Sequence, residues 1–125
     1  MKLQIGFPSK LIALGGFISA LFLLNGAGIA VAQTPQDIAE GRGIADDRRK
    51  GNCFACHQAE GAELAGTVGP PLIYMKLRYP DRQALYEQIA DPRQRNPGTV
   101  MPPYGAHGIL TEHELNRVVD YLLSL

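Results

Sequence analysis

The segment Cys53-Phe54-Ala55-Cys56-His57 decides how this chain folds. Its C-x-x-C-H spacing is the attachment site of a c-type haem. Two thiols on one turn can add to the two vinyl groups of a porphyrin, and the histidine that follows is held against the ring as a proximal iron ligand. The motif therefore predicts one covalent haem c, attached through Cys53 and Cys56, with His57 on the iron. The chain has only these two cysteines, so no free thiol remains after attachment.

Two other kinds of site use the same cysteine spacing. A thioredoxin-like redox pair needs a βαβ context, and no strand–helix–strand pattern surrounds Cys53. A zinc site could complete its ligands with His107 and His113, which have a spacing at the edge of the zinc-finger range. However, about fifty residues separate these histidines from the cysteines, which is far more than a zinc finger allows.

Residues 1–32 have the pattern of a secretory signal peptide. Two lysines precede an uncharged apolar run from Leu11 to Leu24, and a small-x-small cleavage site ends at Ala32. The run is short and rich in glycine for a membrane span. Cleavage after Ala32 would release residues 33–125 to the periplasm as one monohaem domain with no stable membrane insertion, and an uncleaved N-terminal anchor is the alternative. Export agrees with the motif, since c-type haem is attached outside the cytoplasm.

Charge and size also limit the possible functions. The chain has 12 basic and 12 acidic residues, and loss of Lys2 and Lys10 with the signal leaves ten basic against twelve acidic. A nucleic-acid partner would need a strongly basic face, so none is expected. A domain of this size has a modest core, to which a covalently fixed haem adds an apolar centre.

The pattern of apolar residues and helix caps predicts an all-α domain. A helix is expected from Thr34-Pro35 to about Lys50, a shorter one over Asp81–Ala90, and a last one after the capping box Thr111-x-x-Glu114. Gly41 is costly inside the first helix unless another helix crosses closely there. No segment shows strand alternation. Residues 60–75 and 91–108, rich in proline and glycine, are expected to be loops around the haem.

The buried face of the last helix is the clearest periodic pattern in the chain. Its apolar positions follow the three- and four-residue spacing of a helix that packs on one side. These positions are Leu115, Val118, Val119, Leu122 and Leu123.

The second axial position of the iron needs a further ligand. Met101 is the first candidate, because the two prolines that follow it stiffen the backbone of an otherwise irregular loop. Its thioether would raise the haem potential, as suits an electron acceptor. Met75 is the second methionine candidate, although packing explains it more easily. His107 lies in the same loop as Met101 and would give a bis-His haem, whereas His113 is expected to face solvent.

Two further segments next to the motif have candidate roles. A proximal histidine usually donates its second ring N–H to a backbone carbonyl, and the rigid turn at Gly69-Pro70 is a natural place for that carbonyl. An ordinary turn is the alternative. The basic run Arg48-Arg49-Lys50 is either a docking patch for an acidic partner beside the haem edge or basic charge at a helix C-terminus.

Taken together, these motifs resemble the small monohaem class I cytochromes c over residues 37–125. The C-x-x-C-H motif, the Gly69-Pro70-x-Leu72 turn and a methionine in a Met-Pro-Pro loop before a C-terminal helix carry the resemblance. The resemblance implies that the carbonyl of Pro70 accepts a hydrogen bond from the proximal histidine. It also implies that Gly41 and Tyr121 are the glycine and the aromatic residue where the terminal helices cross.

A narrower resemblance is to SoxX, the small haem subunit of the SoxAX complex of thiosulfate oxidation. It rests on the segments Arg49–His57, Asn96–Gly105 and Leu110–Glu114. The resemblance implies a heterodimer with a SoxA-like cytochrome subunit, which joins thiosulfate oxidatively to a cysteine of a carrier protein. This chain would accept the electrons, pass them to a downstream cytochrome c and contribute no catalytic residue. The alternative function is a free-standing periplasmic electron shuttle.

Overall fold

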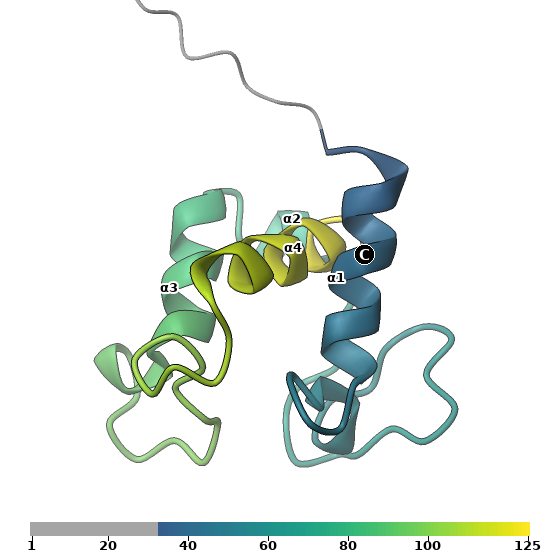
Figure 1. Ribbon diagram of the computed structural model, residues 1–125. Helices are drawn as coiled ribbons and strands as arrows, with labels where there is room; N and C mark the ends of the chain where they lie inside the picture. Colours follow the sequence, from purple (N-terminus) through teal and green to yellow (C-terminus); the bar gives the residue numbers. More distant parts are fainter. Residues whose placement is uncertain (1–32) are drawn as a thin grey trace, which may run out of the picture. The chain divides into compact units, whose positions relative to one another are not determined.

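The computed structural model describes residues 33–125, and the predicted signal peptide lies outside the described residues. Within residues 33–125 the secondary structure is entirely helical, which confirms the all-α prediction (Figure 1). The α-helices are α1 (Pro35–Asp46), α2 (Met75–Arg78), α3 (Arg82–Ala90) and α4 (Glu112–Leu122), and two short 3₁₀ helices are η1 (Cys53–Ala55) and η2 (Pro92–Gln94). None of the helices formed by these residues is long and apolar enough to cross a membrane.

The first helix begins at the predicted cap and ends earlier than predicted. Thr34 and Asp37 form a reciprocal capping box, and Pro35 occupies the first helical turn. The predicted continuation to about Lys50 is wrong, because the backbone leaves the helical conformation and becomes extended at Asp47. The N–H groups of Lys50 and Asn52 then both donate to the Asp47 carbonyl, which closes a turn leading into the C-x-x-C-H motif.

The last helix agrees with its sequence pattern in cap and in buried face. Thr111 and Glu114 form the predicted capping box. All five predicted apolar positions of this helix are buried, as is Leu110 before the cap. Val118 and Val119 are fully covered, so α4 supplies the centre of the apolar core.

The terminal helices cross with their backbones in direct contact at Gly41. A Cβ atom at this position would overlap the carbonyl oxygen of Arg117 and lie 2.9 Å from the Cβ of Tyr121. The predicted crossing of α1 and α4 is therefore confirmed, and it requires a residue without a side chain. The ring of Tyr121 packs edge-to-face on Phe54, with 6.4 Å between the centroids, and so connects the crossing to the C-x-x-C-H motif.

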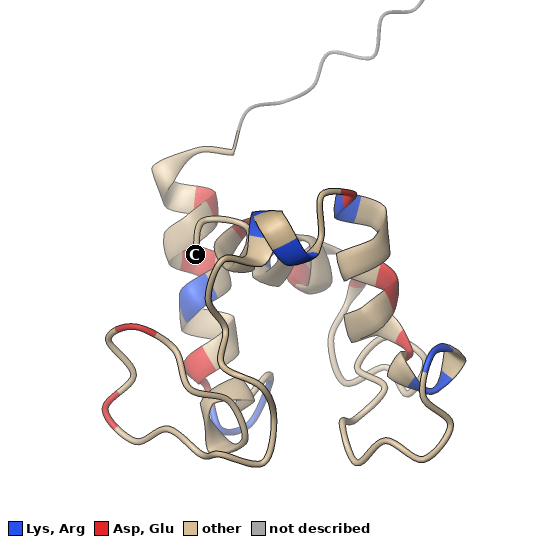
Figure 2. Cartoon of the chain, turned by 180° about the vertical axis from the view of Figure 1, so that it is seen from behind, with Lys and Arg blue, Asp and Glu red and all other residues tan. Residues whose placement is uncertain are grey.

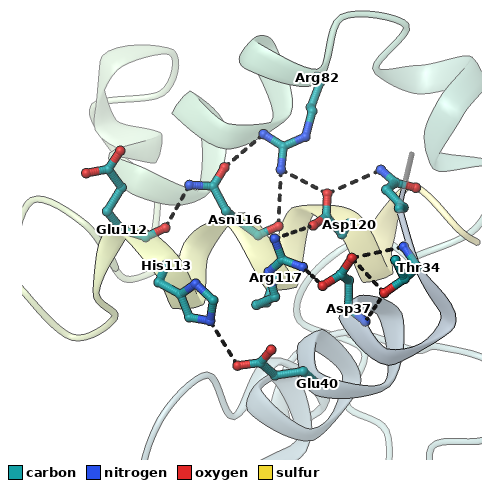
Figure 3. Close-up of polar contacts among 10 residues, drawn as sticks. Thr34, Asp37, Glu40, Arg82, Glu112, His113, Asn116, Arg117 and Asp120 are labelled. Atoms are coloured by element: carbon teal, nitrogen blue, oxygen red, sulfur yellow. Dashed lines mark hydrogen bonds and ion pairs between the residues drawn. The ribbon is translucent and has the colours of Figure 1, made fainter. Parts of the chain in front are cut away.

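A polar network joins three helices on one side of α4 (Figure 3). Asp120 is buried and accepts from Arg82 of α3 at 2.9 Å. Its other carboxylate oxygen lies 3.4 Å from Arg117, which also pairs with Asp37 of α1. Because these charges are partly or fully removed from water, loss of one member would leave another without its partner. The network therefore fixes how α1 and α3 pack on α4.

The helix α2 was not predicted, although the surrounding residues form the expected loop. It has only four residues, which is too few for a periodic pattern to be visible in sequence. Tyr74 precedes it in the left-handed region with φ of 52°, and its N–H donates to the carbonyl of the C-terminal Leu125. This turn directs Met75 into the core, where it is 2% exposed.

Candidate haem site

The C-x-x-C-H segment forms one tight turn that places both cysteines side by side. Residues Cys53–Ala55 are a 3₁₀ helix, in which side chains three residues apart eclipse one another. The N–H groups of Cys56 and His57 both donate to the Cys53 carbonyl, at 3.2 and 2.9 Å. Asn52 enters the turn in the left-handed region, which asparagine tolerates well. Cys53 and Cys56 are half-buried, free thiols on one turn, as covalent attachment requires.

The loop after the motif folds back along it. Backbone N–H groups of Gly66, Gly69 and Leu72 donate to carbonyls of the motif segment, with donor–acceptor distances of 2.7–2.8 Å. The acceptors are Phe54, Cys56 and Gln58. These three hydrogen bonds hold residues 66–72 alongside the motif and in the same chain direction. The predicted proline turn therefore lies against the imidazole of His57.

His57 is oriented by the predicted carbonyl. Its Nδ1 lies 2.7 Å from the carbonyl oxygen of Pro70. Because a carbonyl can only accept, Nδ1 carries the proton and donates, which leaves Nε2 free as a metal-binding nitrogen. Gly69 is required beside it, since a Cβ there would overlap the ring and lie 2.8 Å from Nε2. A side chain at residue 69 would therefore displace the imidazole.

A cavity of about 710 Å³ lies against the C-x-x-C-H turn and the Gly69-Pro70 turn. The volume is in the range of roughly 300–1,000 Å³ that is typical of ligand and cofactor sites. Cys53, Cys56 and His57 line it together with apolar side chains of α3 and of the loop after η2. Both thiols, the oriented imidazole and the mainly apolar lining fit a covalently attached haem.

Met101 and Met75 both line the cavity, whereas His107 and His113 do not. Met101 is half-buried in the loop after η2, and its backbone N–H donates to Thr99 Oγ1 at 3.1 Å. Met75 is 2% exposed, and its sulfur lies 3.5 Å from Nη1 of Arg78, so it is committed to packing. Met101 on a loop therefore keeps its place as the first candidate for the distal ligand.

The two histidines outside the motif are engaged elsewhere. His107 is exposed, and its Nε2 lies 3.3 Å from Nη1 of Arg93. His113 is exposed on the first turn of α4, as predicted, and its Nε2 lies 3.1 Å from Glu40 of α1. Within residues 33–125 no three His, Cys, Asp or Glu side chains are grouped to hold a metal ion, so a zinc site has no ligand set there.

Burial makes the thiol of Cys53 a poor redox nucleophile. Removal from water raises its pKa to about 11, with a smaller rise from the nearby Cys56. A thiol–disulfide exchange site needs the opposite shift, because the thiolate is the reactive form. The surroundings of Cys53 therefore give no support to a thioredoxin-like role.

The basic run before the motif borders the cavity and is partly fixed by α4. Arg48, Arg49 and Lys50 all line it. Lys50 pairs with Glu114, and this hydrogen bond, with that from the N–H of Thr111, lowers the pKa of the Glu114 carboxyl to about 2. In the view of Figure 2, basic and acidic residues are interspersed along the helices and loops.

Sequence analysis missed two residues of the site. Arg78 of α2 lines the cavity and donates to the carbonyl of Pro71 at 2.7 Å, beside the turn that holds His57. Tyr104 also lines it, and burial raises its pKa to about 12. The tyrosine directly follows the Met101-Pro102-Pro103 run, and that proximity was the signal available in the sequence.

Comparison with known proteins gives the class of the chain. Residues 38–125 match the family model for cytochrome c. The chain therefore belongs to the cytochrome c family. Its cofactor is a covalently attached haem c, and the motif at Cys53 and Cys56 fits the attachment sequence of that family. The chain is an electron-transfer cytochrome.

Individual proteins that are similar to this one include a chain of known structure and a curated bacterial protein. A chain in the crystal structure of SoxXA from P. pantotrophus superposes with a TM-score of 0.62 and 28% identity, covering 69% of this chain and 79% of that one. An uncharacterized lipoprotein of Aquifex aeolicus (strain VF5) is 37% identical over 75 residues, which are 59% of this chain. The chain covers 36% of the length of that curated relative.

Proposed function

We propose that this chain is the electron-accepting cytochrome subunit of a SoxXA-type complex, exported to the periplasm after cleavage behind Ala32. The single observation that carries the proposal is the likeness to a chain of SoxXA, at 28% identity over 79% of that chain. When bound, the haem supplies a one-electron couple. When thiosulfate is joined to a cysteine of the carrier protein through a new S–S bond, the reaction releases one proton and two electrons. The complex passes these electrons, one at a time, through this chain to a downstream cytochrome c.

The residues of this chain hold and orient the cofactor. Cys53 and Cys56 would form its covalent attachments, and His57 and Met101 would be the residues that bind its iron. The carbonyl of Pro70, 2.7 Å from Nδ1, fixes the tautomer and direction of the imidazole. Both cysteines are consumed in this arrangement, so the sulfur chemistry of the reaction belongs to the partner subunit and this chain has no catalytic residue.

The rim of the cavity favours a permanent subunit. Val68, Val100 and Ile109 line the cavity and are nevertheless 70%, 82% and 40% exposed. Large apolar side chains grouped at the mouth of a site are typical of an interaction surface. Stable interfaces bury such a group at their centre with charged residues at the edge, and the exposed Arg48 and Arg49 line the same cavity.

A free-standing shuttle is the second candidate. Arg49 is exposed and pairs with Asp47 at 3.7 Å, so it suits transient and salt-sensitive docking. Such docking needs a smaller interface than a permanent subunit. The two functions therefore differ in how tightly the chain binds a partner and in how strongly salt weakens that binding.

We expect the haem-loaded chain to form a stable heterodimer with a SoxA-like cytochrome, because the apolar rim becomes buried. Size-exclusion chromatography at low and high salt measures this, followed by a thiosulfate-dependent cytochrome-reduction assay. Val100→Asp should weaken the heterodimer at least about tenfold, since it buries an unpaired charge. Leu77→Asp is the matched control, because Leu77 is also 82% exposed but does not line the cavity.

A chain that stays monomeric with the SoxA-like subunit contradicts the proposal. So does an unchanged assay rate when this chain is left out. If either outcome is found, and the chain also binds other redox proteins at low salt but not at high salt, the chain is a free shuttle. An unaltered visible spectrum of Val100→Asp is needed as a check that the haem site is intact in that variant.

A further inference from the structure

The loop that carries Met101 is tied to two different walls of the cavity. On one wall, the N–H groups of Tyr104, Gly105 and Ala106 donate to backbone carbonyls at the end of α3, at 3.0–3.3 Å. On the other wall, the hydroxyl of Tyr104 donates to the carbonyl of Gly51 at 2.7 Å. Among the described residues, this is the only side-chain hydrogen bond between residues 96–105 and the segment 47–57.

The acceptor of this hydrogen bond is rigid. Gly51 N–H donates to the Ile44 carbonyl of α1 at 3.1 Å. A Cβ at Gly51 would lie only 2.6 Å from that same oxygen and 3.2 Å from the sulfur of Cys53. Gly51 is therefore wedged between α1 and the attachment turn. Tyr104 is 8% exposed, so its hydrogen bond is shielded from competition by water.

We propose that Tyr104 is a positioning residue whose hydroxyl latches the Met101 loop onto the attachment wall of the cavity. Without the latch, the loop loses its one side-chain link across the cavity, so its backbone bonds to α3 open more often. The proposal rests on the assignment of Met101 as the distal ligand. Opening of the loop withdraws the methionine and gives outside ligands access, so the latch sets the population of the open state.

Imidazole binding to the oxidised, haem-loaded protein measures that population, because imidazole occupies the distal position only when Met101 has left. A typical net hydrogen-bond contribution changes an opening equilibrium by about fivefold. Tyr104→Phe should therefore keep the sulfur-to-iron near-infrared band without added ligand and bind imidazole about fivefold more tightly. Tyr86→Phe is the matched control, because Tyr86 is a half-buried tyrosine of α3 that does not line the cavity.

Hydrogen exchange gives a second readout without any added ligand. The amides of Gly105 and Ala106 should lose about fivefold protection in Tyr104→Phe and none in Tyr86→Phe. Equal imidazole affinity and equal protection in Tyr104→Phe and the wild type would overturn the latch. Imidazole binding that changes while these amides do not would place the effect outside the loop and overturn it too.

The wild-type protein provides a test that does not depend on a variant that folds. Its imidazole adduct, with the loop released, should exchange the Gly105 and Ala106 amides faster than the free protein. Unchanged protection in the adduct would contradict a latched loop. A failure of the ligand assignment is distinguishable, because Met101→Ala would then leave the near-infrared spectrum unchanged whatever Tyr104→Phe does.

Discussion

Gly41→Ala should lower the free energy of unfolding of the haem-loaded protein by about 3 kcal/mol or more, at the upper end of overpacking effects. The added Cβ would overlap the carbonyl oxygen of Arg117, which belongs to the backbone of α4. A backbone atom cannot rotate away, so the two terminal helices would have to separate. Denaturant unfolding followed by far-ultraviolet circular dichroism measures the loss.

Gly43→Ala provides a matched control in the same helix. A Cβ at Gly43 meets no atom within 4 Å, so the change should add about 0.5–1 kcal/mol through helix propensity alone. The two substitutions are chemically identical and lie two residues apart. If both raised stability, the close crossing of α1 and α4 at Gly41 would be wrong.

Met101→Ala should abolish the near-infrared sulfur-to-iron band of the oxidised protein and lower its reduction potential. The thioether favours reduced iron, so its loss stabilises the oxidised form. A fall on the order of 0.1 V or more is expected, as part of the roughly 0.8 V over which axial ligands and their surroundings set haem potentials. Absorption spectroscopy and a redox titration of the purified protein measure both effects.

Met75→Ala is the control, since Met75 also lines the cavity but is 2% exposed in the core. It should keep the band and lose about 2–5 kcal/mol of stability, as buried methionines do on truncation. Loss of the band in Met75→Ala but not in Met101→Ala would make Met75 the ligand. A spectrum that changes only in His107→Ala would indicate two histidine ligands.

The fold was largely predictable because its main signals are local. Thr34 and Thr111 each start a helix with a side-chain cap that is visible in four residues of sequence. The crossing at Gly41 was expected because glycine inside a helix needs a compensating reason. The end of α1 was misplaced because it depends on the Asp47 turn, which combines backbone bonds with one hydrogen bond from the Arg49 N–H to Asp47 Oδ1. An aspartate inside a polar run is too common to mark such a turn in the sequence.

The site was predictable where residue type alone defines the chemistry. The spacing of Cys53 and Cys56 requires no tertiary information, and the turn at Pro70 is stiffened by its own sequence. The roles of Arg78 and Tyr104 could not be assigned from the sequence, although Tyr104 directly follows the Met101 run, because each acts through a backbone carbonyl of another loop. A carbonyl acceptor is present at every residue, so its use leaves no mark in the sequence.

The most direct test of the account is the intact mass of the mature protein, purified from the periplasm of cells that attach c-type haem. We predict the mass of residues 33–125 plus one haem, retained after acid–organic extraction because thioether bonds at Cys53 and Cys56 hold it. Replacement of both cysteines by alanine should give the polypeptide mass alone. A wild-type mass without haem, or haem that the extraction removes, would contradict covalent attachment and the role derived from it.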